Sequence, residues 1–157
     1  MVKVLFVCLG NICRSPTAEG VFRAVLEREG LAGRVEVSSA GTGNWHVGEP
    51  PDGRAVRAAR RRGVDLSAIR ARQAGAGDFG RFDYIVAMDG DNRAMLARLC
   101  PKGAEHRLHL CLDFAPGLEG GDVPDPFYGG GDGFEAVLDM IERAAEGLLA
   151  DIRRKHL

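Results

Sequence analysis

The chain has no long apolar run, almost no net charge and few cysteines, and each absence excludes a class of protein. No stretch of about 18 apolar residues could cross a membrane as a helix, so we expect no membrane partner. The formal net charge of −1 over 157 residues excludes bulk attraction to nucleic acid. Four cysteines are too few for a disulfide scaffold. With no secretory leader pattern, a cytoplasmic location with free thiols is predicted.

What remains is an ordinary globular composition. Apolar residues make up 45% of the chain and charged residues 27%, close to the averages of folded domains. The length suits one core, so residues 1–157 are predicted to form a single domain.

Short apolar runs alternate with helical patterns, which is typical of a parallel sheet covered by helices. The first run, residues 2–7, is almost continuously apolar, as expected of a strand buried on both faces. Ser15 is expected to cap the first helix, with Pro16 at its first position. The pattern predicts an α/β fold: a single doubly wound domain whose four-stranded parallel sheet is flanked by helices on both faces. The expected strands are 2–7, 34–39, 82–88 and 107–112, and the main helices follow at 16–30, 54–62, 91–99 and from 132 onward.

The segment VCLGNICRSPTAEG, residues 7–20, joins the first strand to the first helix. Ligands of doubly wound sheets bind beyond the carboxyl ends of strands, and Cys8 stands at such an end. Gly10 permits tight curvature, and Asn11 tolerates a left-handed backbone. The loop would aim peptide N–H groups at one point beside a helix N-terminus, and Arg14 adds a planar fork of donors that fits phosphate oxygens. The segment therefore predicts an anion site with a sulfur at its floor.

Donors that hold an anion also stabilise a thiolate, so Cys8 is predicted to be a nucleophile, with the Ser15 hydroxyl donating to its sulfur. Packing, a metal site or a disulfide could also account for a cysteine at this position. The spacing of Cys8 and Cys13 is poor for zinc and has no second pair downstream, and no Gly-Lys-Ser/Thr sequence of a nucleotide-binding loop occurs. The placement of C-x5-R-S between a buried strand and a helix favours the anion site.

A thiolate that attacks a phosphate ester needs a general acid for the leaving oxygen. Asp125 is the first candidate, because it lies between two prolines and before two aromatic residues in VPDPFYGG. A plain Asp-Pro turn is the alternative at this position. Asp113, Asp122 and Asp89 are weaker candidates, and Asp89 is expected to cap the helix after the third strand.

The segments CLGNICRSP, SSAGT, NWHVGEPPD, FDYIVAMD and DPFYGG, in this order over nearly the whole chain, resemble the low-molecular-weight protein tyrosine phosphatases. The resemblance implies a four-stranded parallel sheet, no metal or other cofactor, and hydrolysis of phosphotyrosine and small aryl phosphates through a cysteinyl-phosphate intermediate. The implied partners are a phosphotyrosine-containing protein and inorganic phosphate as product or inhibitor. The implied assembly is a monomer that forms at most a weak homodimer.

The resemblance also assigns roles by position. It implies that Cys8 is the nucleophile, Arg14 the transition-state clamp and Asp125 the acid and then the base. The implied phosphate-binding loop is Leu9, Gly10, Asn11, Ile12, Cys13, Arg14 and Ser15, supported by Asn11, Ser15 and Ser39. Cys13 is the implied redox partner that traps oxidised Cys8 as a disulfide. The implied substrate cleft is formed by Ile12, Trp45, Phe127 and Tyr128, although a lone tryptophan can also simply cover a core edge.

Four competing functions stay open. Thiol-coupled arsenate reductases share C-x5-R-S, but Cys100 and Cys111 look like core thiols here. Protein-arginine phosphatases resemble this loop with threonine at the position of Ile12, whereas isoleucine suits an aryl face. A non-catalytic phosphate-binding module is a third possibility, and degenerate modules usually lack the cysteine, the arginine or the acid. A metal site at His106, His109 and Cys111 is disfavoured, because strand positions three apart face opposite ways.

Overall fold

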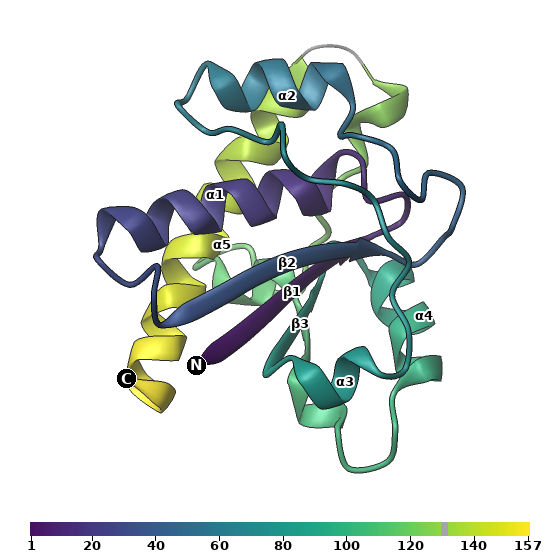
Figure 1. The fold of residues 1–157 in the computed structure, drawn as a ribbon, viewed down its shortest axis with the longest axis vertical. Coiled ribbons are helices and arrows are strands. Elements are labelled where there is room, and N and C mark those ends of the chain that lie inside the picture. Colours follow the sequence, from purple (N-terminus) through teal and green to yellow (C-terminus); the bar gives the residue numbers. More distant parts are fainter. Residues whose placement is uncertain (130–131) are drawn as a thin grey trace.

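The computed structural model describes residues 1–129 and 132–157 (Figure 1). Within these residues, four parallel strands form one sheet in the order β2-β1-β3-β4. The strands are β1 (Val2–Cys8), β2 (Val35–Gly41), β3 (Tyr84–Ala87) and β4 (Leu108–Leu110). The helices are α1 (Arg14–Arg28), α2 (Gly53–Arg60), α3 (Asp78–Arg81), α4 (Gly90–Leu99) and α5 (Asp132–His156). The predicted parallel sheet is thereby confirmed.

Helices cover both faces of this sheet, and each face has its own apolar core. Alternate residues of β1 point to opposite faces, as its pleat requires. Val4 and Phe6 pack in the larger core with residues of α1, α2 and α5, whereas Leu5 and Val7 pack in the smaller core with residues of α3 and α4. Figure 1 shows α1 and α5 on one side of the sheet and α3 and α4 on the other. The doubly wound arrangement explains why β1 is apolar at almost every position.

The start of α1 differs from the prediction. The helix begins at Arg14 rather than after Ser15, and Cys13 stands at the N-cap position without a side-chain cap bond. The Cys13 carbonyl already accepts the hydrogen bond of Thr17 N–H at 3.2 Å, which closes the first turn. Ser15 does not cap the helix because its hydroxyl is turned into the loop that precedes the helix, where it contacts Asn11 and Cys8.

Two other predicted boundaries change at the far side of the sheet. The third strand is β3, shorter than the predicted 82–88, and the fourth ends at Leu110 rather than at 112. Cys111 therefore lies in the 3₁₀ turn Cys111–Phe114 and not in a strand. Residues 130–131 lie outside the described residues, and α5 begins at Asp132, where the last helix was predicted to start.

The chain reverses its direction of winding at β1, and this places the site. From β1 the chain goes first to β2 on one side and then to β3 on the other. Loops that leave the carboxyl end of β1 therefore open into a crevice, which is where such sheets bind ligands. Cys8 is the last residue of β1, and it pairs in register with Gly41 at the end of β2.

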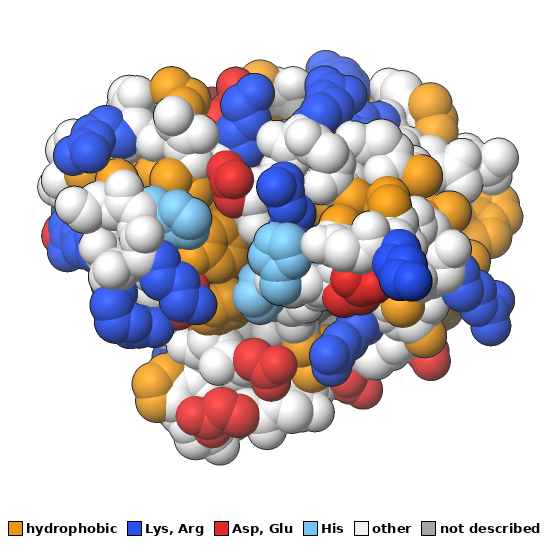
Figure 2. All heavy atoms as spheres, turned by 90° about the horizontal axis from the view of Figure 1, so that it is seen from below, with side chains coloured by type: hydrophobic (Ala, Val, Ile, Leu, Met, Phe, Trp, Pro, Cys, Tyr) orange, Lys and Arg blue, Asp and Glu red, His pale blue; other side chains and the backbone are white. Residues whose placement is uncertain are grey.

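The surface seen from below in Figure 2 mixes basic and acidic side chains, with histidines beside an apolar hollow. No large area of one charge sign stands out on this face. Among residues 1–129 and 132–157, no helix is both long enough and apolar enough to cross a membrane.

Candidate active site

The loop after β1 turns its carbonyl groups away from the crevice. The carbonyls of Cys8 and Leu9 accept hydrogen bonds from Thr42 N–H and Gly43 N–H, both at 2.9 Å, and the Ile12 carbonyl accepts one from Asp52 N–H at 2.8 Å. In a trans peptide the C=O and the following N–H point in opposite directions. The N–H groups of the next residues are therefore directed inward, beside the N-terminus of α1. This arrangement suits an anion with several oxygens.

Asn11 holds the loop in this curvature. Its φ of 59° makes it the single non-glycine residue with a left-handed backbone among those described. Its side-chain amide donates to Ser15 Oγ at 2.8 Å and to Ser39 Oγ at 3.1 Å, and its Oδ1 accepts from Arg72 N–H at 3.0 Å. Asn11 and Ser15 therefore support the loop from behind rather than line the crevice. The resemblance implied a supporting role for Asn11, Ser15 and Ser39, and the structure brings these three side chains together.

The Cys8 sulfur lies at the floor of the loop, and Cys8 is 3% exposed. Its Sγ is 3.0 Å from Ser15 Oγ and 3.3 Å from the N–H of Asn11. The Ser15 hydroxyl has one proton and two acceptors within reach, since the Ala40 carbonyl lies 3.2 Å away. When Cys8 is a thiolate it can only accept, and the hydroxyl proton is then best placed on the sulfur side. When Cys8 is a thiol, the Ser15 hydroxyl can instead donate its hydrogen bond to the Ala40 carbonyl.

Arg14 is 2% exposed and is held by three groups from distant segments. Its Nη1 donates to Asp89 Oδ2 at 2.5 Å and to the Val123 carbonyl at 3.0 Å, and its Nη2 lies 3.6 Å from Asp125 Oδ2. Burial alone would lower the pKa of Arg14, but the hydrogen bond to Asp89 and the nearby acidic groups raise this pKa above its usual value. The guanidinium is therefore charged and fixed in orientation.

Asp89 has a second contact that sequence reasoning did not predict. The expected cap is confirmed, since Asp89 Oδ1 accepts from Asn92 N–H at 2.7 Å at the start of α4. Its other oxygen binds Arg14. A carboxylate at the end of β3, beside the crevice, was the available signal, because the carboxyl ends of neighbouring parallel strands meet at one edge.

Asp125 lies across the crevice from the sulfur, in the loop before the 3₁₀ turn Pro126–Tyr128. One oxygen accepts from Phe127 N–H at 3.1 Å, which leaves the other to face Arg14 at 3.6 Å. The three weaker candidates have other hydrogen-bond partners: Asp113 accepts from Gly120 N–H, Asp122 from Gly90 N–H, and Asp89 from Arg14 and Asn92 N–H.

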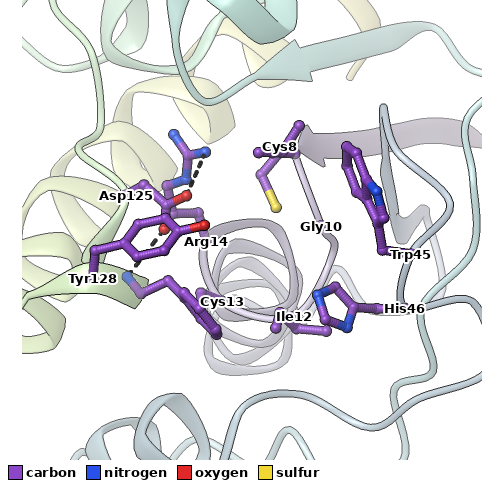
Figure 3. Close-up of a pocket in the computed structure, with 11 residues that line it drawn as sticks. Cys8, Gly10, Ile12, Cys13, Arg14, Trp45, His46, Asp125 and Tyr128 are labelled. Carbon is purple, nitrogen blue, oxygen red and sulfur yellow. Dashed lines mark hydrogen bonds and ion pairs between the residues drawn. The ribbon is translucent and has the colours of Figure 1, made fainter.

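A pocket of about 370 Å³ opens above the loop. In Figure 3 the Cys8 sulfur points into it, with Arg14 and Asp125 on one side and Trp45 and His46 on the other. Trp45 is 67% exposed, so it does not cover a core edge. The lining residues are Cys8, Leu9, Gly10, Ile12, Cys13, Arg14, Trp45, His46, Asp125, Phe127 and Tyr128.

His46 is a wall residue that the sequence reasoning did not name. Its Nδ1 lies 3.2 Å from Glu49 Oε2. The ring packs over Gly10, where a Cβ would come within 3.1 Å of His46 Cδ2. The signal was its place directly after Trp45 in the loop that faces the crevice.

The other cysteines are thiols in different surroundings. Burial, with the charges of Asp52, Cys8 and Asp125, raises the pKa of Cys13 to about 12, so Cys13 is protonated at neutral pH. A protonated thiol attacks slowly, and its exchange with oxidised Cys8 stays a prediction. Cys111 is fully buried, and burial raises its pKa to about 12. Cys100 is partly exposed at the end of α4.

The disfavoured metal cluster is dispersed in the structure. His106 lies in the 3₁₀ turn Glu105–Arg107, and His109 lies on β4 with its ring stacked on Tyr84. Within residues 1–129 and 132–157, no three His, Cys, Asp or Glu side chains gather in a group that could hold a metal ion.

The sequence profile of one family covers almost the entire chain. The family described as Low molecular weight phosphotyrosine protein phosphatase matches residues 3–157. The chain belongs to this family. It is therefore an enzyme of the protein tyrosine phosphatase class, with phosphoproteins as the class of substrate.

Individual relatives agree with this assignment. The low molecular weight protein-tyrosine-phosphatase of Streptomyces coelicolor is 48% identical over 158 residues, covering 98% of this chain and 94% of that protein. A crystal structure of a protein tyrosine phosphatase from Entamoeba histolytica, with Hepes in its active site, is 39% identical and superposes with a TM-score of 0.95 over 100% of both chains.

A relative with another substrate has the same fold. The YwlE arginine phosphatase, solved as a mutant with a phosphorylated active-site serine, is 27% identical and superposes with a TM-score of 0.87 over 99% of this chain and 98% of that chain. Fold alone therefore does not choose between phosphotyrosine and phosphoarginine in this phosphatase.

Proposed function

We propose that this phosphatase hydrolyses phosphotyrosine with Cys8 as nucleophile, Arg14 as phosphate clamp and Asp125 as acid and base. The observation that carries the proposal is the Cys8 sulfur at the floor of a ring of inward N–H groups, with Arg14 and Asp125 facing the same pocket. The peptide groups from Leu9 to Ser15 form the phosphate-binding loop of this proposal.

In the first step the phosphate group binds the loop, and Arg14 places its fork on two of the phosphate oxygens. The Cys8 thiolate attacks phosphorus, and an S–P bond forms as the P–O bond to the tyrosine ring breaks. Asp125 gives its proton to the leaving phenolate oxygen. The hydrogen bonds from Ser15 Oγ and Asn11 N–H prepare the sulfur as an anion before the attack and stabilise it again when it leaves.

In the second step a water molecule takes the place of the phenol. The Asp125 carboxylate removes a proton from this water as its oxygen attacks phosphorus. The S–P bond breaks, inorganic phosphate leaves, and the thiolate and protonated Asp125 are restored. One carboxyl group can serve both steps because the oxygen of the leaving phenol and the oxygen of the attacking water occupy the same side of phosphorus.

The shape of the pocket favours an aryl phosphate. The Cys8 sulfur is buried, so the side chain that bears the phosphate must be long enough to reach it from the surface. The phenyl ring of phosphotyrosine is longer than the methylene group of phosphoserine and meets this requirement better. Ile12 and the ring of Trp45 line the pocket on the way. Aromatic stacking is worth about 0.5–1.5 kcal/mol beyond burial. Phosphotyrosine is therefore preferred over phosphoarginine, whose polar guanidinium would be set against an apolar wall.

The first test is hydrolysis of p-nitrophenyl phosphate at mildly acidic pH in the presence of a chelator. Wild type is expected to turn over, and Cys8→Ser is expected to abolish turnover. Cys100→Ser is the matched control, since it removes a thiol outside the pocket and should leave the rate unchanged. Loss of arsenate reduction on Cys100→Ser, with no phosphatase rate, would instead support the reductase.

The role of Asp125 is tested by changing the leaving group. Asp125→Asn should slow a substrate with a poor phenol leaving group far more than one with p-nitrophenolate, because only the poor leaving group needs the proton. An equal loss with both would contradict the acid role. Substrate class is decided by paired peptides of one sequence that carry phosphotyrosine or phosphoarginine, and equal turnover of both would defeat the preference for tyrosine.

A further inference from the structure

A short strap, residues 71–74, joins three parts of the site that are far apart in the sequence. At the end of β2, Gly41 N–H donates to the Arg72 carbonyl, and Ala74 N–H donates to the Gly41 carbonyl, both at 2.8 Å. Toward the cleft, Gly48 N–H donates to the Ala71 carbonyl at 2.8 Å and Ala71 N–H to the Glu49 carbonyl at 2.9 Å. The strap thus contacts the loop that carries Trp45 and His46.

The third contact of the strap is with the phosphate-binding loop. Arg72 N–H donates to Asn11 Oδ1 at 3.0 Å. A backbone N–H can only donate, so it requires the oxygen of the Asn11 amide on its side and turns the NH₂ group toward Ser15 and Ser39. The same amide holds Asn11 at φ 59°, where its own N–H reaches the Cys8 sulfur. The position of one strap N–H therefore bears on the shape of the loop.

An ion pair on the outer side anchors the strap. The Arg72 guanidinium donates through Nη1 and Nη2 to both oxygens of Asp78, at 3.2 and 3.0 Å. Asp78 is 5% exposed and also accepts from Gly75 N–H at 2.9 Å. Neither side chain lines the pocket. A bidentate pair fixes both distance and orientation, which a single contact would not.

We propose that Arg72 and Asp78 are positioning residues for the phosphate-binding loop. Their ion pair holds the strap so that Arg72 N–H keeps the Asn11 amide in place, and Asn11 in turn keeps the loop curled around the phosphate. The proposal rests on the proposed function for the role of the loop. The contacts from Asp78 to Arg72 and from Arg72 to Asn11 are observed independently of that function.

The test compares Asp78→Asn with Asp151→Asn as a matched control. Asp151 is also a buried carboxylate with an arginine partner, Arg154, and it accepts from Tyr84 OH at 2.7 Å, away from the pocket. Both variants are expected to unfold at lower temperature. Only Asp78→Asn should weaken inhibition by inorganic phosphate. The expected loss is about tenfold, because a left-handed backbone costs a non-glycine residue roughly 1–2 kcal/mol and the anchored amide of Asn11 would no longer offset this cost. Asp78→Asn should also change the rate at which iodoacetate alkylates Cys8 at neutral pH, because the Asn11 N–H would no longer be held toward the sulfur.

A second background separates positioning from general damage. Asn11→Gly tolerates the left-handed backbone without a side-chain amide. If Asp78 acts through Asn11, adding Asp78→Asn to Asn11→Gly should change phosphate inhibition little, so the two effects are non-additive. Equal losses in both backgrounds, or unchanged phosphate inhibition in Asp78→Asn alone, would overturn the proposal.

Arg72→Lys gives a milder variant should Asp78→Asn fail to fold. It keeps the charge and the backbone N–H but loses the fork, so an intermediate loss of phosphate inhibition is expected. No loss would overturn the anchoring role. The affinity for inorganic phosphate can also be measured directly by calorimetric titration, and neither this measurement nor alkylation of Cys8 requires turnover. Absence of Cys8-dependent hydrolysis in wild type would therefore count against the proposed function and not against the strap.

Discussion

The Trp45 ring packs directly against Gly43, and a methyl group added at residue 43 is predicted to displace the ring. A Cβ at residue 43 would lie 1.8 Å from Trp45 Cζ3 and 2.2 Å from Cε3. Ordinary contact begins at 3.4 Å, so the ring must retreat by about 1.6 Å or rotate away. Alanine keeps the N–H that donates to the Leu9 carbonyl. Gly43→Ala therefore changes the cleft wall and leaves the backbone bond in place.

The magnitude follows from the contact that is lost. If Trp45 stacks on the substrate ring, its displacement forfeits about 0.5–1.5 kcal/mol. This corresponds to a fall of about 2- to 13-fold in kcat/KM for an aryl phosphate. Inorganic phosphate has no ring and is held by the loop alone, so its inhibition constant should not change.

The assay measures both quantities for wild type, Gly43→Ala and a control glycine variant. Gly33→Ala is the control, because a Cβ at residue 33 meets no heavy atom within 4 Å. Weaker phosphate inhibition in Gly43→Ala, by the same factor as the loss in kcat/KM, would mean that the clash distorts the loop. An unchanged kcat/KM would refute the stacking role of Trp45.

Three further predictions concern residues other than Cys8, namely Asp89, His109 and Gly147. Asp89→Asn should keep the α4 cap but lose the charged bond to Arg14, worth roughly 1.5–3 kcal/mol of stability, so the melting temperature should fall by about 3–12 °C. The kcat should fall as well, because the Arg14 guanidinium is no longer held in orientation; a lower melting temperature with unaltered kcat would contradict this role of Asp89. Burial lowers the pKa of His109, so the unfolded chain binds more protons below its ordinary pKa of about 6.5, and stability should fall as pH drops through that value. Denaturant unfolding at neutral and mildly acidic pH should show a smaller fall in His109→Gln than in wild type. Gly147→Ala would place a Cβ 1.7 Å from the Phe114 carbonyl oxygen, so calorimetry should show destabilisation of about 1–3 kcal/mol, and an unchanged melting temperature would show that α5 shifts freely.

Much of the candidate site could be predicted because its central residues are neighbours in the chain. Cys8, Asn11 and Arg14 stand in one loop between a buried strand and a helix, and local backbone rules apply to such a loop directly. The apolar pattern of β1 and the helical periodicity of α5 are also local signals, and both elements are where they were predicted. The predicted start of α1 was wrong. The Ser15 hydroxyl contacts Asn11 and the Cys8 sulfur instead of capping the helix, and residue preferences at helix caps do not take such contacts into account.

Residue order alone determined the parallel α/β class and the loop that surrounds Cys8, since periodicity and turn chemistry act over a few residues. Only the tertiary structure decided that Asp89 divides its two oxygens between a helix cap and Arg14, 75 positions away in the chain. It also decided that Arg72 N–H meets Asn11, 61 positions away. These contacts form when strands and crossover connections pack side by side, and that packing depends on the whole chain rather than on any local pattern.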